Sequence, residues 1–257
     1  MSAPKKKKKR ILTKSLVAPL VVLVVLVGVL EFVARVFDVN EHILPPPSAW
    51  LMDTVAVFGD IAPHLLFTIK IIVLGFVISV VLGMLIAALL SQSKLLTNAF
   101  SPLILCLVIT PMMTLIPIML LWLGTNPDLR LLVIIVQATP IICFNTLNGF
   151  NNVETEKLQL GTSVGATKLQ TFMKISFMNA MPQVFTGVKL GCIFSTIGAI
   201  GADFVGGIKG MGTRIQFYTG MNATAVSYGC ILLVALIGLI LYYAVEAVER
   251  RVIIWKK

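Results

Sequence analysis

The sequence has little of what a soluble enzyme needs. Only 12% of its 257 residues are charged, and its only histidines are His42 and His64. It contains neither the G-x-x-x-x-G-K-[ST] loop that holds nucleotide phosphates nor the H-E-x-x-H motif of zinc peptidases. We therefore expect no catalytic residue, no metal and no cofactor on this chain.

The four cysteines show no pairing pattern. Each lies inside an apolar run, without C-x-x-C or Cys/His spacing: Cys106, Cys143, Cys192 and Cys230. We expect them to act as small hydrophobic side chains rather than as disulfide or metal partners.

Long apolar runs are what the sequence has in abundance. With 58% apolar residues and a mean hydropathy of +0.97, it lies outside the range of soluble domains. A membrane-spanning helix needs about 20 apolar residues. Six segments reach this length, so we predict an all-α, polytopic membrane protein in which residues 1–257 form one transmembrane domain, with spans at about 16–37, 64–90, 100–123, 131–150, 186–205 and 225–245.

The basic residues indicate an orientation. Fifteen of the 21 fall in segments that six spans place on one side: seven near the N-terminus, Lys94, three in the loop 151–185 and four at the C-terminus. The positive-inside rule then predicts that both termini and this loop are cytoplasmic, including the basic stretch 1–15. Near the outer end of the first span, Glu31 and Arg35 are four residues apart and are expected to pair.

The middle spans are unusual for lipid-facing helices. Pro111, Pro117 and Pro140 each free a backbone carbonyl that protein or water has to satisfy. We predict that these helices line a path for a small polar solute, although each polar group could instead bridge helices. The spans show no buried arginine for an anion and no aromatic cage for a cation, which leaves the solute open. The candidate path residues are Thr110, Met113, Thr114, Gln137, Thr139, Asn145, Ser195 and Thr196.

The loop between the fourth and fifth spans is amphipathic. Leu158, Leu160, Val164 and Leu169 recur at roughly helical spacing, and glycines interrupt the pattern. We predict a short helix, a glycine turn and a second short helix. An apolar stripe outside the bilayer needs a protein or lipid surface to cover it.

This loop also carries a motif. Gln159-Leu160-Gly161 is followed by Gly165-Ala166, and Ile175 comes ten residues after Gly165. The order resembles the E-A-A, three residues, Gly, nine residues, Ile, x, Leu, Pro loop with which ABC importer permeases dock on their ATPase. The resemblance assigns ATPase coupling to Leu158, Gln159, Leu160, Gly161, Val164, Gly165, Ala166, Thr167 and Lys168.

Further segments along the chain extend the resemblance. They are the prolines 45–47, His64 with Thr68, the run from Pro111 to Pro117, Asp203 where a glutamate is usual, and Gly210-x-Gly212. Together they are similar to type I, binding-protein-dependent permeases of the nitrate, sulfonate, taurine and bicarbonate group, which also handles thiamine precursors and riboflavin.

The resemblance implies a permease in the plasma (inner) membrane of a bacterium. Its partners would be a second copy of itself, two ATPase subunits that bind ATP and Mg²⁺, an extracytoplasmic solute-binding protein and lipid, with no nucleic acid. The chief alternative is a secondary carrier or channel, which would transport without an ATPase; a membrane scaffold or a membrane enzyme is a more distant one.

Overall fold

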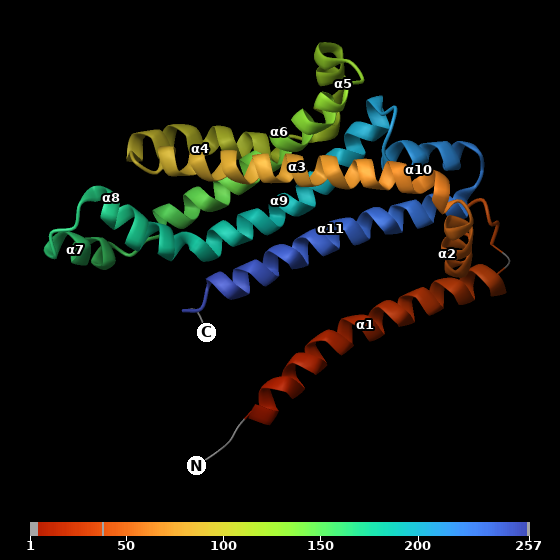
Figure 1. Ribbon diagram of the computed structural model, residues 1–257, viewed down its shortest axis with the longest axis horizontal. Coiled ribbons are helices and arrows are strands. Elements are labelled where there is room, and N and C mark those ends of the chain that lie inside the picture. The colour runs from red at the N-terminus through yellow and green to blue at the C-terminus, as the bar shows by residue number, and fades with distance from the viewer. Residues whose placement is uncertain (1–4, 38, 256–257) are drawn as a thin grey trace. The chain divides into compact units, whose positions relative to one another are not determined.

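The computed structural model describes residues 5–37 and 39–255, without the side chains of residues 5–17, 19, 20 and 127. All regular secondary structure in these residues is helical, which confirms the all-α prediction (Figure 1). The chain divides into two compact units, one of residues up to 60 together with 215–231, the other of 61–214 together with the residues from 232 on.

The first unit contains α1 (Lys5–Val36), α2 (Pro47–Ala56) and the adjoining turns of α3 (Phe58–Leu90), α10 (Met211–Gly220) and α11 (Thr224–Val252). The first predicted span lies on α1, but its residues 16, 17, 19 and 20 and the basic stretch 1–15 fall outside the described side chains. Sequence reasoning assigned no helix to the proline-rich segment that contains α2. The helix forms there because Pro47 sits at its first position, where a missing N–H costs nothing.

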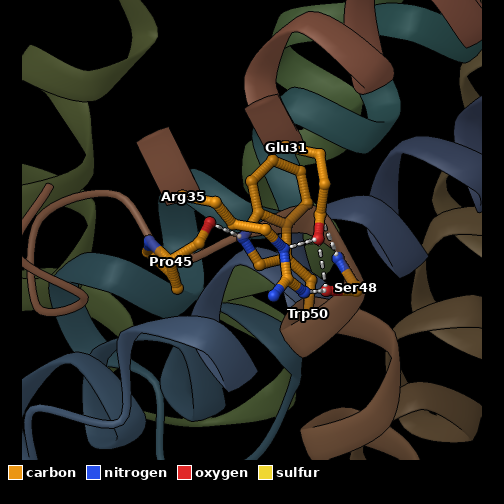
Figure 2. Close-up of polar contacts among 5 residues, drawn as sticks. All are labelled: Glu31, Arg35, Pro45, Ser48 and Trp50. Carbon is orange, nitrogen blue, oxygen red and sulfur yellow. Dashed lines mark hydrogen bonds and ion pairs between the residues drawn. The ribbon is translucent and has the colours of Figure 1, made fainter. Parts of the chain in front are cut away.

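Glu31 links α1 to the start of α2 (Figure 2). Its carboxylate accepts a hydrogen bond from the Ser48 backbone N–H at 2.9 Å and one from the Ser48 hydroxyl at 2.8 Å. The N-cap residue of α2 is Pro46, whose side chain cannot cap, so Glu31 satisfies a free donor of the first turn from another helix. Arg35 Nε lies 2.6 Å from Glu31, which confirms the predicted pair.

Aromatic side chains hold the loop before α2 to α11. Trp50 donates through its indole N–H to the Pro45 carbonyl at 2.7 Å, as Figure 2 shows, and its ring stacks on Tyr228 at 4.8 Å. The Tyr228 hydroxyl in turn donates to the Ile43 carbonyl. Trp and Tyr are common at membrane interfaces because one end of each ring system is apolar and the other polar.

The second unit is built around α6 (Pro127–Asn151) and α9 (Phe177–Gly206), which lie side by side (Figure 1). Small residues let the helices approach closely. Ile142 of α6 is fully buried and fills a notch formed by Gly83 of α3 and by Gly187 and Gly191 of α9. The apolar core continues along α6 through Ala138, Cys143 and Leu147.

The third predicted span is broken. α4 (Lys94–Ile109) and α5 (Met112–Leu123) meet at 92°, with Thr110 and Pro111 between them. Pro111 lacks the N–H that would continue α4, which is the physical reason for the break. In the described part of the chain, four helices are long and apolar enough to cross a membrane, or five if this bent pair counts as one span.

Candidate functional site

The predicted glycine turn is present after α7 (Thr155–Ser163). The Ala166 N–H donates to the Gly161 carbonyl and the Gly165 N–H to the Thr162 carbonyl, both at 3.0 Å. Gly165 has φ of +72°, the left-handed conformation that this helix-ending motif requires. The turn therefore favours glycine and disfavours β-branched side chains at this position.

The segment after the turn differs from the prediction of a separate short helix. α8 (Lys168–Thr171) runs through a π-helical turn, η1 (Phe172–Ser176), directly into α9. α8 starts with a capping box in which the Thr167 hydroxyl accepts from the Gln170 N–H and the Gln170 side chain accepts from the Thr167 N–H. The expected second short helix is therefore the first part of one helical stretch from Lys168 to Gly206.

The apolar stripe of this segment is only partly covered. Leu158 is half-buried, whereas Leu160, Val164 and Leu169 are 64%, 74% and 71% exposed. Gly161 is buried, and a Cβ there would come within 3.0 Å of Ile175 in η1. α7 thus packs on η1 at Gly161 and leaves an apolar surface facing outward from the second unit.

Residues 161–165, Gly-Thr-Ser-Val-Gly, also fit the G-x-S-x-G pattern of serine hydrolases. That motif needs the serine on a strand-to-helix turn, within reach of a histidine. Here Ser163 ends a helix, and its hydroxyl donates to the Leu160 carbonyl at 2.9 Å. The chain's two histidines are at positions 42 and 64, far from this segment in sequence. The local geometry is that of a helix C-terminus, not of a nucleophile.

Two predicted path residues meet at one small cavity. Thr110, at the break between α4 and α5, and Gln137 of α6 both line a cavity of about 30 Å³. Gln137 Oε1 is buried without a hydrogen-bond partner and lies against Gly198 of α9. The volume is about that needed by one water molecule.

The other predicted path residues do not converge on this cavity. Thr139 and Ser195 have buried hydroxyls without a partner, whereas Asn145, Thr196 and Thr114 bond to backbone carbonyls of their own helices or helix ends. Met113 packs on Gly201 of α9. The set is distributed along α6, α9 and the α4–α5 break, and its role in transport stays a prediction.

Sequence reasoning missed a buried ion pair. Arg130, which the prediction placed in an outer loop, belongs to α6 and is 3% exposed. Its Nε lies 2.6 Å from Oδ1 of Asp203 near the end of α9. Sequence reasoning left Arg130 in a loop because its partner lies 73 residues away and no local pattern connects the two.

Comparison with known proteins agrees with the fold and with the predicted group. The family described as "Binding-protein-dependent transport system inner membrane component" matches residues 79–254. The formylaminopyrimidine transport permease protein ThiX of Halalkalibacterium halodurans is 26% identical over 241 residues, which cover 93% of this chain and 96% of that protein. The taurine transport system permease protein TauC of Escherichia coli is 23% identical over 240 residues, covering 91% and 87%.

A solved structure shares the architecture. The MetNI methionine ABC transporter in inward facing conformations superimposes with a TM-score of 0.65 at 20% identity, covering 77% of this chain and 98% of that one. This likeness shows the fold, and the predictions of an all-α membrane permease of the type I importer class are confirmed. Since the family match spans more than half of the sequence, the chain belongs to the binding-protein-dependent transport system inner membrane components and is the permease subunit, not an enzyme, of an ABC importer.

Proposed function

We propose that this permease works as a pair of identical copies with two ATPase subunits and an extracytoplasmic binding protein. ATP and Mg²⁺ are held by the ATPase subunits, and this chain supplies the path through the membrane. The family description and the relatives' names support an assembly that depends on a binding protein. We call residues 158–168 the coupling segment, and two copies of the chain would place two coupling segments at two ATPases.

The observation that carries the proposal is the uncovered apolar surface of α7 and α8. Leu160, Val164 and Leu169 project outside the unit that carries them. Apolar surface of this kind, next to polar residues, marks an interaction site. We assign the ATPase subunit as the partner of this surface, with residues 158–161 and 164–168 in contact with it. The turn at Gly165 would hold α7 and α8 in the orientation that this contact needs.

The mechanism follows from a shift between two states. ATP bound between the two ATPases favours the state in which they are closed, and the docked segments carry this motion into the helices. The bundle then changes from inward-open to outward-open by rigid-body rotation. In this proposal the α4–α5 break and Gln137 lie on the solute path, where a freed carbonyl or an unpaired amide replaces water around the solute.

The solute class stays broad. The relatives are named for taurine, aliphatic sulfonates, nitrate, a formylaminopyrimidine and riboflavin, which include both anions and neutral ring compounds. We propose a small polar solute of this range for the present chain.

Purification of the complex tests the assembly. The chain co-expressed with its ATPase is expected to purify as a 2:2 complex, measured by native mass spectrometry. Alone in proteoliposomes it should accumulate none of taurine, nitrate and a formylaminopyrimidine. Accumulation by the chain alone, driven by an ion gradient, would identify a secondary carrier and overturn the proposal.

Cysteine labelling tests the orientation. Ser163 of α7 and Glu41 of the loop before α2 are both exposed, and Cys106 is the one exposed cysteine among the described residues. In a Cys106→Ala background and intact cells or right-side-out vesicles, an impermeant maleimide is expected to label Glu41→Cys and to label Ser163→Cys only after lysis. Labelling of Ser163→Cys in sealed vesicles would place the coupling segment outside.

A further inference from the structure

The connection between α9 and α10 is wrapped around Asp203. Of its two carboxylate oxygens, Oδ1 accepts from Arg130 Nε at 2.6 Å, and Oδ2 accepts from the Gly212 N–H at 3.1 Å. The side chains of Asp203 and Arg130 are 2% and 4% exposed. We call Asp203, Arg130 and the backbone of residues 210–212 the Asp203 clasp.

Three glycines of this connection leave room for that aspartate. A Cβ at Gly207, Gly210 or Gly212 would collide with atoms of Asp203. Gly210 also has φ of +137°, a conformation that side chains other than glycine rarely adopt. The close approach of this connection to the backbone and side chain of Asp203 is thus possible only because these three positions are glycine.

The clasp also joins α10 to α3. The Gly210 N–H donates to His64 Nδ1 at 3.0 Å, and the Met211 N–H donates to the Thr68 hydroxyl at 2.9 Å. With Gly212 bonded to Asp203, three consecutive donors at the start of α10 are satisfied by side chains of two other helices. Arg130 extends the contact to α6, and its guanidinium lies 5.4 Å from the centre of the Phe67 ring of α3.

A buried ion pair is a weak source of stability, because desolvation offsets most of its attraction. Its geometry, however, fixes the positions of the two helices that carry the charges. If either charge moves away, both are left buried without a counter-charge. At this site the carboxylate of α9 binds α6 and α10, and α3 binds the backbone beside it. From Asp203, α9 leads without a break to α8. The helical stretch 168–206 has 39 residues, about 58 Å at 1.5 Å per residue, and it ends at the coupling turn.

We propose that the Asp203 clasp transmits the docking of the binding protein at the outer side to the coupling segment, with Asp203 and Arg130 as positioning residues. The inference rests on the proposed orientation and partners. A displacement of the start of α10 moves Asp203, α9 follows as one rod, and α8 moves at the ATPase. Reciprocity then requires that the ATPase state alter the affinity for the binding protein.

The test measures the rate of ATP hydrolysis by the complete 2:2 complex, first alone and then with its purified binding protein added. The ratio of the two rates is the stimulation. Asp203→Asn leaves Arg130 buried without its counter-charge, and is expected to retain unstimulated hydrolysis but to lose stimulation by about fivefold or more. Asp128→Asn is the matched control, because Asp128 lies exposed at the start of α6. It should behave like the parent.

A milder variant keeps the test decisive if Asp203→Asn does not assemble. Thr68→Val is nearly isosteric and removes only the acceptor of the Met211 N–H. It is expected to assemble and to lower stimulation by about twofold to fivefold. Full stimulation in Thr68→Val, or equal losses of unstimulated and stimulated hydrolysis in Asp203→Asn, would mean that the clasp is only structural. A parent complex without stimulation would instead overturn the proposed function.

Discussion

Gly165→Val is expected to abolish the stimulation of ATP hydrolysis by the solute-loaded binding protein, whereas Gly165→Asn should retain most of it. Gly165 is at the left-handed position that ends α7, and no atom lies within 4 Å of the place where its Cβ would be. The effect of a side chain there is therefore one of backbone conformation and not of crowding. Asparagine tolerates this conformation, and a β-branched residue does not.

The strain of a left-handed valine, about 1–2 kcal/mol, corresponds to about a fivefold to thirtyfold loss of the turn. Without the turn, α7 and α8 would no longer present Leu160, Val164 and Leu169 on one surface. The measurement is ATPase activity of the reconstituted complex, with complex formation followed by gel filtration. Unchanged stimulation in Gly165→Val would show that this turn does not couple the chain to the ATPase subunits.

Local features of the sequence predicted the parts of the fold that local physics determines. Pro111 lies at the break between α4 and α5, as expected, because it cannot donate the next hydrogen bond of α4. Pro117 and Pro140 were expected to interrupt their spans as well, and this was wrong, since they lie inside α5 and α6. Gly165 predicted the turn, and the spacing of Glu31 and Arg35 predicted their pair. Apolar length predicted the long helices, although their ends moved by several residues, as at Pro127, where α6 begins before the expected Leu131.

Features that depend on distant partners could not be predicted in this way. Asp203 was visible as a charge at the end of a span, but nothing in its surroundings pointed to Arg130. α10 was taken for a loop because its glycines are typical of turns, whereas side chains from α3 and α9 satisfy its first donors. Gln137 was selected for its chemistry, and only the structure shows that its Oε1 is without a partner.

Gly83→Val is expected to prevent tight packing of α3 on α6 and to leave little assembled permease. A Cβ at Gly83 would lie 2.9 Å from Cβ of Ile142 and 3.1 Å from the Thr139 carbonyl oxygen. Neither atom is the free end of a flexible side chain. Ile142 cannot retreat, because Gly187 and Gly191 of α9 enclose it from the other side. The two helices must therefore separate.

Overpacking of this kind costs about 1–3 kcal/mol and sometimes more, or a fall of about 6–12 °C in melting temperature at the upper end for a chain of this size. Within lipid, close packing is the main force between helices, so nothing compensates for the lost contact. Gly59→Val provides the matched control on the same helix, since no atom lies within 4 Å of its Cβ position. Thermal unfolding in detergent, followed by fluorescence gel filtration, should show the loss for Gly83→Val alone. Equal melting temperatures for both variants would mean that α3 does not rest on Ile142 as the structure shows.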